Sequence, residues 1–425
     1  EEEMNLYDDC AGKLAPFTAE KQTVTVYVCG ITPYDTTHLG HAFTYASFDV
    51  LIRYLEYRGY TVRYCQNVTD IDDDILRKAR EVGSDWHALG NAWTAHFIRD
   101  MIALNVRPPD FYPRATEVID NIITVVARLI EAGVAYPGNG NVYFDVERFP
   151  EYGQLSGIPK DEMLPIANER GNRPDDPHKR HPLDFVLWQA QAPGEPAWGS
   201  PWGPGRPGWH IECSTMAGTF LGPNLDIHGG GGDLIFPHHE SEIAQAVCST
   251  GHEPFARYWL HTAMVHHDGE KMSKSLGNLV MISDLLQRTT ADALRLYLAG
   301  HHYRDVWTHS EAALAEAGRG ASLLAAAAGT TATAGRGAGA APLDPGPAEA
   351  ALVAALDDDL DTPTALAALL DLGRHILTAA AAGVDVAAAQ TVLRRAAAIF
   401  GLRLDAGEPE PRVQDGWGEH LTRFE

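Results

Sequence analysis

The chain has 425 residues, more than one hydrophobic core normally supports, so two or three domains are expected. Its formal net charge of −24 argues against a protein that holds nucleic acid through a broad basic surface. Five cysteines in this length do not suggest a disulfide framework, so a reducing, cytoplasmic compartment is expected. Neither a signal peptide nor an apolar run long enough to span a bilayer is evident, so no membrane partner is expected.

Residues 22–105 are predicted to alternate strands and helices. The run Thr23–Cys29 predicts a strand, Leu39–Arg58 predicts a helix, and Tyr60–Cys65 predicts a second strand that leads into residues 67–70. Strand, loop and helix in this order form one half of a nucleotide-binding fold. The chain is therefore expected to have an α/β fold whose first half holds a nucleotide at the loop after the first strand.

Two motifs far apart in the sequence point to phosphate chemistry. His38 and His41 flank a glycine at the start of the predicted helix, and Lys271-Met272-Ser273-Lys274-Ser275 lies far downstream. A carboxylate that attacks the α-phosphate of ATP builds negative charge on phosphorus and on pyrophosphate, so fixed donors and cations must already face it. Imidazoles at a helix N-terminus and lysines on a mobile loop supply them.

Each of these motifs alone also fits an ordinary turn or a solvated surface loop. Their combination with a strand–loop–helix unit favours an enzyme that uses ATP, with Mg²⁺, to form an adenylate. The expected catalytic residues are His38, His41, Lys271 and Lys274.

Beyond residue 105 the composition divides the chain further. Residues 106–180 are rich in proline and contain one predicted helix, Thr116–Gly133, so they are interpreted as an inserted connective subdomain. Residues 181–265 are expected to return to the core, and 266–310 to carry the lysine motif and a stem-contact region. The last unit, 311–425, is predicted to be a helical bundle with an Ala/Gly-rich linker near 327–347 and helices at Ala348–Asp357, Pro363–Ala382 and Val384–Gly401.

The charge of this last unit suggests which partners it has. Residues 311–425 hold 16 Asp and Glu against 8 Arg, and no lysine follows Lys274. A terminal RNA-binding module is expected to be basic, so no nucleic-acid partner is expected. The alternative is that a GC-rich genome has enriched Ala, Gly and Arg without regard to function. Since no coiled-coil seam is evident, a monomer is expected.

A third set of residues has the chemistry of a metal site. Cys29 ends the first predicted strand, Cys213 lies in the segment 209–213, and His238 and Glu242 are spaced to share one face of a helix. Two thiolates and an imidazole suit Zn²⁺, although buried structural cysteines explain the spacing equally well. Zinc with an open position binds a thiolate directly and so selects cysteine over serine, whereas Lewis-acid catalysis at the carboxylate is the competing role.

These residues closely resemble cysteinyl-tRNA synthetases, which are class I enzymes. The match runs through YVCGITPYDTTHLGHA, NVTDIDDDI, GRPGWHIECS, DIHGGGGDLIFPHHESEIAQ, GEKMSKSLGN and DDDLDTP, and it is dense over residues 24–310. The resemblance implies a Rossmann-like class I nucleotide-binding core with an inserted subdomain and a C-terminal α-helical bundle.

The resemblance also implies roles for individual residues. One Zn²⁺ is expected on Cys29, Cys213 and His238, with Glu242 as a lower-ranked fourth ligand because the substrate thiolate can take its place. The residues expected around the cysteinyl group are Thr32, Thr69, Trp209 and Asp233, of which Thr69 and Asp233 suit the α-ammonium. Those expected along the adenylate are Gly30, Ile31, Thr44, Asn67, Val68, Gly231, Gly232 and Val265. For Thr44 and Val265, simple packing is the alternative.

Three features resemble a related family more closely, the mycothiol-pathway ligases that join cysteine to glucosaminyl-inositol. They are the segment Glu169-Arg170-Gly171-Asn172-Arg173-Pro174, Phe43 in place of arginine after the histidine motif, and the short acidic tail. Asn172 and Arg173 depart from the usual Gly-Asp of that family. The expected partners are then small molecules: L-cysteine, ATP and 1D-myo-inositol 2-amino-2-deoxy-α-D-glucopyranoside, whose amine accepts the cysteinyl group.

Two alternatives remain. One is a cysteinyl-tRNA synthetase with a reduced C-terminal domain, which predicts aminoacylation of tRNA. The other is a non-catalytic zinc-bearing cysteine sensor, against which the intact catalytic motifs argue.

Overall fold

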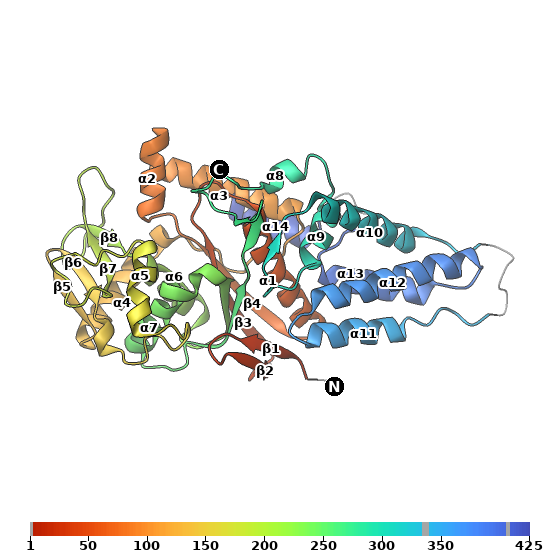
Figure 1. Ribbon diagram of the computed structural model, residues 1–425, viewed down its shortest axis with the longest axis horizontal. Coiled ribbons are helices and arrows are strands. Elements are labelled where there is room, and N and C mark those ends of the chain that lie inside the picture. Colours follow the sequence, from red (N-terminus) through yellow and green to blue (C-terminus); the bar gives the residue numbers. More distant parts are fainter. Residues whose placement is uncertain (1–2, 334–339, 405–408) are drawn as a thin grey trace.

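A parallel sheet of four strands forms the centre of the molecule (Figure 1). The structure, a computed structural model, describes residues 3–333, 340–404 and 409–425. The strands lie in the order β10 (Ala256–Thr262), β9 (Leu225–Gly231), β3 (Thr23–Ile31) and β4 (Thr61–Val68). The chain continues from β3 to β4 on one side and from β9 to β10 on the other. The carboxyl ends of β3 and β9 therefore form a topological switch point, where folds of this class bind ligands.

Helices cover both faces of this sheet. Side chains of β3 point alternately to the two faces, so the strand contributes to a hydrophobic cluster on each face. Val24, Val26 and Val28 belong to one cluster, whereas Tyr27 and Cys29 belong to the other. This alternation follows from the two-residue period of a strand, and it delivers the Cys29 thiol to the second face. The first cluster includes residues of α1 (Leu39–Tyr57), α3 (Trp86–Ala103) and α9 (Ala291–Ala299). The second includes residues of α4 (Ile119–Glu131), α6 (Trp209–Leu221) and α7 (Glu240–Thr250).

The inserted subdomain is built on an antiparallel sheet at one end of the molecule (Figure 1). Its strands, in order, are β5 (Ala135–Gly138), β6 (Asn141–Phe144), β7 (Phe185–Ala190) and β8 (Gly205–Pro207). Helix α5 (Lys160–Glu169) lies in the connection between β6 and β7. The sheet therefore continues past residue 180, the expected end of the insertion, because β7 pairs with β6, and β8 with β7, rather than with the parallel core.

The lysine motif begins on a short hairpin next to the core. Strand β11 (Val265–His267) pairs antiparallel with β12 (Glu270–Lys271) and parallel with β13 (Trp307–Thr308). A two-residue turn, Asp268-Gly269, reverses the chain with both residues at positive φ, a conformation that glycine adopts without strain. The hairpin therefore fixes the backbone of Lys271 and leaves its side chain able to move.

The C-terminal part is helical, and it forms the opposite end of the molecule (Figure 1). Its helices are α10 (Glu311–Gly329), α11 (Gly346–Asp357), α12 (Thr362–Ala381), α13 (Ala387–Ile399) and α14 (Pro411–Leu421). Helix α10 includes the first residues of the expected linker 327–347, of which residues 334–339 lie outside the described parts. Helix α14 leaves the bundle and packs on α3, where Trp417 Nε1 donates to the Val106 carbonyl at 2.8 Å.

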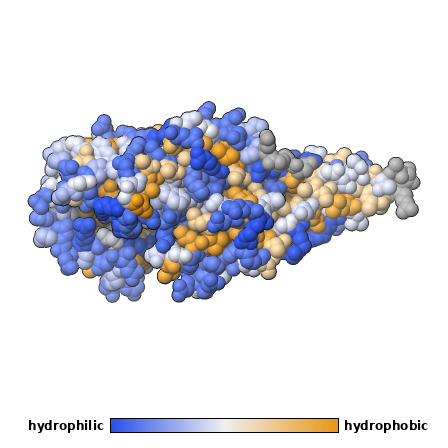
Figure 2. Space-filling model, turned by 90° about the horizontal axis from the view of Figure 1, so that it is seen from above, coloured by the Kyte–Doolittle hydropathy of each residue, from blue (hydrophilic) through white to orange (hydrophobic). Residues whose placement is uncertain are grey.

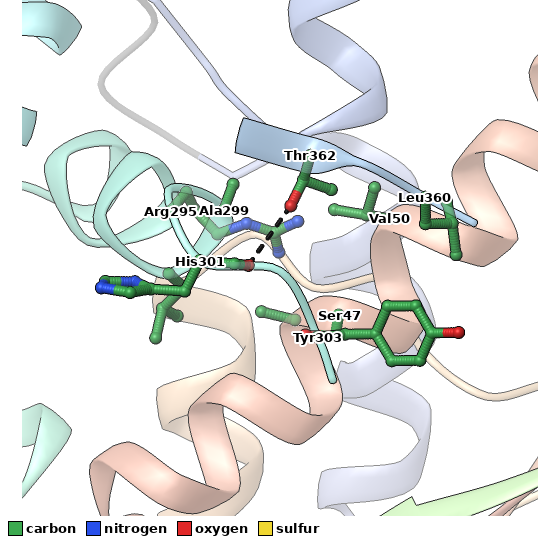
Figure 3. A pocket seen from close by; sticks show the side chains of 10 residues that line it. Ser47, Val50, Arg295, Ala299, His301, Tyr303, Leu360 and Thr362 are labelled. Atoms are coloured by element: carbon green, nitrogen blue, oxygen red, sulfur yellow. Dashed lines mark hydrogen bonds between the residues drawn. The ribbon is translucent and has the colours of Figure 1, made fainter. Parts of the chain in front are cut away.

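A buried ionic network joins the core to the bundle. The Asp49 carboxylate accepts from Arg53 Nε at 2.9 Å and from Arg295 Nη2 at 2.7 Å, and these side chains are at most 2% exposed. Arg295 Nε also donates to the Phe400 carbonyl at 2.8 Å, just after α13. Burial alone would raise the pKa of Asp49, but the two guanidiniums outweigh it and hold the pKa below its usual value. A small cavity lies beside Arg295, with Thr362 of the bundle in its lining (Figure 3).

The surface differs along the length of the molecule. On the face seen in Figure 2, apolar colour gathers over the middle and the narrow helical end, whereas the end with the inserted subdomain is mostly hydrophilic. Within residues 3–333, 340–404 and 409–425, no helix has both the length and the apolar character needed to cross a bilayer.

Candidate active site and metal-binding cluster

A cavity of about 790 Å³ lies at the carboxyl ends of β3 and β9. Both motifs expected to handle phosphate reach it, since His38, His41, Lys271 and Lys274 are among its lining residues. The other expected site residues on its wall are Cys29, Gly30, Ile31, Thr32, Thr44, Thr69, Trp209, Cys213, Gly231, Asp233, His238 and Val265. Residues from both halves of the core thus meet at the switch point of the sheet.

Asn67 lies behind the wall and holds two residues that face the cavity. Its Oδ1 accepts from the Gly30 amide at 2.8 Å, and its Nδ2 donates to Thr69 Oγ1 at 3.2 Å. A Cβ at Gly30 would lie 1.5 Å from the Asn67 carbonyl oxygen, so only glycine fits there. Of the other expected residues, Val68 is buried in the hydrophobic core and Gly232 begins the short turn that carries Asp233.

The two histidines cap helix α1 reciprocally. His38 Nδ1 accepts from the His41 amide at 3.2 Å, His41 Nδ1 accepts from the His38 amide at 3.4 Å, and the rings stack with centroids 3.6 Å apart. Burial, and then the nearby lysines, lower the pKa of His38 to about 3, while burial and His38 hold the pKa of His41 well below its usual value. Both rings are therefore neutral, and each keeps its proton on Nε2, where it is available to a ligand.

The two lysines of the motif contact different partners. Lys274 Nζ donates to the Tyr34 carbonyl at 2.6 Å and lies 3.5 Å from the centre of the Tyr34 ring. Burial lowers the pKa of Lys274 to about 8. Lys271, in contrast, is 42% exposed and forms an ion pair with Asp233, with Nζ 3.7 Å from Oδ2. Both ammonium groups are close enough to His38 to lower its pKa. The loop therefore lies over the end of the cavity that holds His38 and His41, hereafter the phosphate end.

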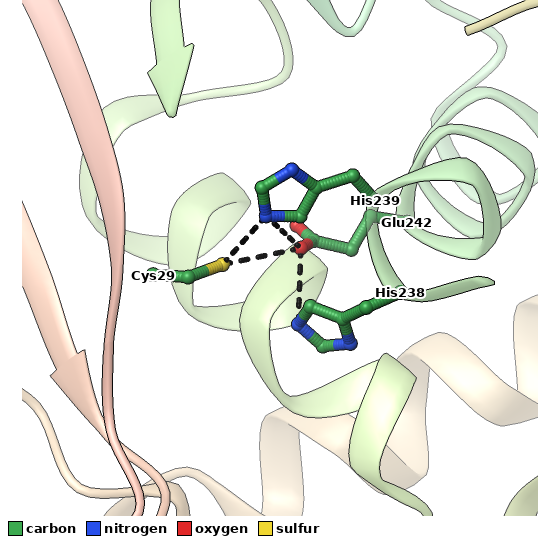
Figure 4. Close-up of side chains that lie close together, drawn as sticks. All are labelled: Cys29, His238, His239 and Glu242. Atoms are coloured by element: carbon green, nitrogen blue, oxygen red, sulfur yellow. Dashed lines mark hydrogen bonds and ion pairs between the residues drawn. The ribbon is translucent and has the colours of Figure 1, made fainter. Parts of the chain in front are cut away.

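Four buried side chains form a cluster at the other end of the cavity (Figure 4). The ligand atoms of Cys29, His238, His239 and Glu242 all lie within 4.8 Å of one another. Cys29 Sγ is 3.2 Å from His239 Nε2 and 3.4 Å from Glu242 Oε1. His238 Nε2 is 3.3 Å from Glu242 Oε1 but makes no hydrogen bond although it is buried, which suits a nitrogen that coordinates a metal.

The charge balance of this cluster also suits a cation. Burial raises the pKa of Cys29 and of Glu242 well above their usual values, so an apolar site disfavours both anions. A divalent cation would offset that cost. Cys213 lies beside the cluster and forms a hydrogen bond with Cys29. This hydrogen bond further raises the pKa of the Cys29 thiol. Two thiols, an imidazole and a carboxylate are a donor set that Zn²⁺ accepts.

His239 is a member of the cluster that the sequence reasoning missed. On a regular helix, adjacent residues point about 100° apart, so His238 and His239 would not be expected to share one site. Here the turn Ile235–His239 before α7 is irregular, with Phe236 in an extended conformation, and both rings reach the cluster. The only signal in the sequence was the His-His pair itself.

Arg170 of the segment 169–174 lines the same cavity, and residues 169–173 line a neighbouring cavity that shares Thr32, Trp209 and Asp233 with it. The Arg170 guanidinium donates to the Asp233 carbonyl, which ties the inserted subdomain to the turn after β9. Asn172 Nδ2 donates to Asn168 Oδ1 at 2.7 Å and to the Pro182 carbonyl at 3.0 Å, while its Oδ1 accepts from Lys179 at 2.7 Å. Asn172 therefore holds the loop in shape, and Arg170 is a second contributor that sequence reasoning did not assign.

Comparisons with known proteins agree with this geometry. Residues 16–319 match the family of class I tRNA synthetase (C) catalytic domains, and residues 351–405 match the DALR domain. The cysteine--tRNA ligase of Dehalococcoides mccartyi is 45% identical over 96% of this chain and 88% of its own length. That of Moorella thermoacetica is 46% identical over 88% of this chain and 80% of its own length. This chain belongs to the cysteine--tRNA ligase family. As a member of that class I family it is an ATP-dependent ligase.

Solved structures confirm the fold class expected from the sequence. Mycobacterium tuberculosis methionyl-tRNA synthetase, in complex with methionyl-adenylate, has a TM-score of 0.60 at 18% identity, over 95% of this chain and 93% of that one. The Agrobacterium radiobacter K84 agnB2 LeuRS, in a ternary complex with tRNA and LeuAMS, has a TM-score of 0.62 at 12% identity, over 96% and 86%. The fold is a Rossmann-like class I core followed by a helical domain.

The assignment to the mycothiol ligases is wrong, because the relatives and the DALR domain identify the tRNA ligase family instead. Phe43 is fully buried and packs edge-on against Trp307, with ring centroids 5.4 Å apart, so it belongs to the core and does not report on the acceptor. The DALR domain is not evident from the acidic, alanine-rich composition of the tail, because its fold depends on apolar periodicity rather than on net charge. The expectation that the chain has no nucleic-acid partner is overturned by the same findings.

Proposed function

We propose that the chain attaches cysteine to tRNA-Cys. In the first half of the reaction, cysteine and Mg-ATP form cysteinyl-adenylate and release pyrophosphate. In the second half, a ribose hydroxyl at the acceptor end of the tRNA attacks the activated carbonyl, and AMP leaves. The acceptor atom is thus an oxygen rather than the amine expected from the mycothiol resemblance. The observation that carries this proposal is the 45% identity to a cysteine--tRNA ligase over 96% of the chain.

The phosphate end of the cavity supports the first half-reaction. The Nε2–H groups of His38 and His41 can donate to phosphate oxygens, and Lys271 and Lys274 can neutralise the charge that develops on the departing pyrophosphate. Since neutral imidazoles need not lose a hydration shell as cations do, they suit a buried position beneath the phosphates.

The end of the cavity that holds the buried cluster around Cys29, hereafter the thiol end, supports selection of the amino acid. Cys29, Cys213 and His238 would hold Zn²⁺, Glu242 would be a fourth donor whose place the substrate thiolate can take, and His239 lies beside them. When bound there, Zn²⁺ supplies an open position that takes the substrate thiolate and discriminates against a hydroxyl. Trp209 stacks on His238 with centroids 4.1 Å apart, so it supports that ring while it forms a wall of the cavity.

The middle of the cavity would hold the rest of cysteinyl-adenylate. Asp233 and the Thr69 hydroxyl suit the α-ammonium, and Thr32 lies on the same wall. Backbone at Gly30, Ile31, Gly231 and Gly232 allows the adenylate to approach closely. Thr44 Oγ1 lies 2.7 Å from Thr262 Oγ1, and Thr44 and Val265 both line the cavity.

The elongated shape supports a large partner. The DALR match covers residues 351–405, at the end of the molecule opposite the inserted subdomain (Figure 1). A tRNA that reaches from that helical end to the cavity would place its acceptor end near the adenylate. The chain's own free thiols, Cys10 and Cys248 among them, suit the reducing cytoplasm in which such a reaction takes place.

A direct comparison of acceptors tests the proposal. Purified protein is given cysteine and Mg-ATP together with tRNA-Cys, glucosaminyl-inositol or a tRNA for serine, and AMP release and product formation are measured. We expect cysteinyl-tRNA with tRNA-Cys alone. Product formation with the aminosugar but not with tRNA-Cys would refute the proposal, and cysteine-dependent ATP–pyrophosphate exchange reports the first half-reaction separately.

A further inference from the structure

Both lysines of the 271–275 motif are engaged by other parts of the protein. Lys274 contacts Tyr34 through a hydrogen bond and through the ring face. Lys271 is paired with the Asp233 carboxylate across the mouth of the cavity, at 3.7 Å. Yet Asp233 is also the carboxylate best suited to the α-ammonium of cysteine, and Lys271 is a group expected to meet the phosphates of ATP. Each partner of this ion pair therefore has a second, competing role.

We propose that Asp233 exchanges one ammonium group for another when cysteine binds. The substrate's α-ammonium takes the carboxylate and displaces the Lys271 ε-ammonium, which becomes available to the phosphates of ATP. Cysteine binding thereby strengthens ATP binding. This inference rests on the proposed function, since it requires that the cavity hold both substrates.

The position of Asp233 makes such an exchange feasible. The residue follows the carboxyl end of β9 in the short helical turn Gly232–Leu234. Arg170 of the inserted subdomain donates to its backbone carbonyl, so the main chain is held while the carboxylate stays 36% exposed to the cavity. A Cβ at Gly231 would come within 2.8 Å of Asp233 Oδ1, so glycine leaves room beside the carboxylate.

Lys271 is equally suited to leave. Its backbone is fixed in the β11–β12 hairpin, where it pairs with His266, and only its side chain must rotate. The side chain is 42% exposed, so an ion pair at this site is weak and is easily replaced. Lys274, buried against Tyr34, is not in contact with the carboxylate and would not take part.

The size of the effect follows from the weakness of the pair. Because an exposed ion pair is weak, bound cysteine should raise the affinity for ATP by no more than about two- to fivefold. Because binding free energies are reciprocal, Mg-ATP should strengthen binding of the cysteine analogue by the same factor. The coupling should also shrink as salt rises, since both groups are partly exposed.

Two thiol alcohols separate the ammonium from every other part of the substrate. L-Cysteinol and 3-mercaptopropan-1-ol share the thiol and the hydroxyl, but only cysteinol carries an ammonium, and neither has the carboxylate needed to form an adenylate. Calorimetric titration of Mg-ATP into the zinc-loaded full chain is done with each alcohol at saturation. We expect cysteinol to tighten ATP binding two- to fivefold and mercaptopropanol to leave it unchanged.

Two variants complete the test. Lys271→Ala should lose the cysteinol effect because no ion pair remains to be exchanged, whereas the matched variant Lys274→Ala should keep it. Equal effects of the two alcohols, an effect that survives in Lys271→Ala, or a cysteinol that does not bind would each overturn the exchange. Charging of tRNA-Cys by the wild type is measured in parallel. Normal charging without coupling refutes only the exchange, while absent charging refutes the proposed function.

Discussion

The two ends of the catalytic cavity are built in different ways. At the thiol end, Cys29 on β3 and His238 and Glu242 from the segment that leads into α7 are all buried and lie within 4.8 Å of one another. At the phosphate end, the histidines are fixed by capping, but Lys271 lies 42% exposed on a hairpin. A group that must recognise one atom type benefits from a donor set that is preformed. Side chains that stabilise the negative charge on the phosphates during the reaction and on the leaving pyrophosphate must be able to move. The comparison predicts that substitutions at the thiol end affect binding of the amino acid, and those at the phosphate end affect the rate.

The largest effect is expected from Cys29→Ser. Serine is a poor zinc ligand, so we expect loss of zinc and a fall in kcat/KM for cysteine on the order of 1,000-fold. Zinc content by mass spectrometry and ATP–pyrophosphate exchange measure the two effects. Cys248→Ser, half-buried on α7, is the matched control and should change neither. Stripping zinc from the wild type with a chelator should reproduce the defect without a substitution, and full exchange in a zinc-free protein would contradict the assignment.

Lys274→Ala should affect the other end. The proposed role of Lys274 is to face the departing pyrophosphate, so we expect kcat for adenylation to fall about 100-fold in this variant with little change in cysteine affinity. Rapid-quench measurement of adenylate formation gives the rate, and titration with cysteinol gives the affinity. If both quantities fell equally, Lys274 would be a structural residue and the contrast between the two ends would not hold.

A smaller effect is expected from Gly40→Ala. The new Cβ would lie 2.9 Å from the His38 ring, so the imidazole must shift. We expect adenylation to slow about tenfold because a displaced donor stabilises the transition state less well. Alanine is the better helix former, so the midpoint of thermal unfolding should not fall. A rate defect that came with a lowered midpoint would point to general damage to α1 instead.

The smallest effect is a pH dependence at the phosphate end. Because burial lowers the pKa of Lys274 to about 8, the free enzyme loses that positive charge as the pH rises through 8. We expect kcat/KM for ATP, at saturating cysteine, to fall about fivefold between pH 8 and pH 9. Lys274→Arg keeps its charge over this range and should show a flatter profile. Identical profiles for the two proteins would show that another group titrates.

Local periodicity predicted the core well because its signals lie within short stretches. The strand expected at Thr23–Cys29 and the helix expected at Leu39–Arg58 correspond to β3 and α1 within two residues at each end. The pairing of β6 with β7, and of β7 with β8, depends on contacts between residues far apart in the chain, which no local pattern reports.

Motifs that carry their own chemistry could be located from the sequence, although their catalytic roles stay a prediction, whereas residues placed by geometry could not be located. His38, His41, Lys271 and Lys274 line the cavity as expected. His239 reaches the cluster only because the turn before α7 departs from regular helix geometry. The acceptor is not predicted correctly, because Phe43 belongs to the core, Asn172 holds its own loop and net charge does not identify a partner. A bundle folds through its apolar faces, and the overall acidity of residues 311–425 does not reveal what such a bundle binds.

The network around Asp49 has a consequence for how the protein melts. Arg53 and Arg295 share the carboxylate of Asp49, and the C-terminal part supplies further acceptors: Glu410 for Arg53 and the Phe400 carbonyl for Arg295. Separating this part from the core would leave a buried guanidinium without its second carboxylate, at a cost of about 3–5 kcal/mol, which is a large fraction of the stability of a domain. Core and bundle should consequently unfold in one cooperative transition, with a single calorimetric peak rather than two.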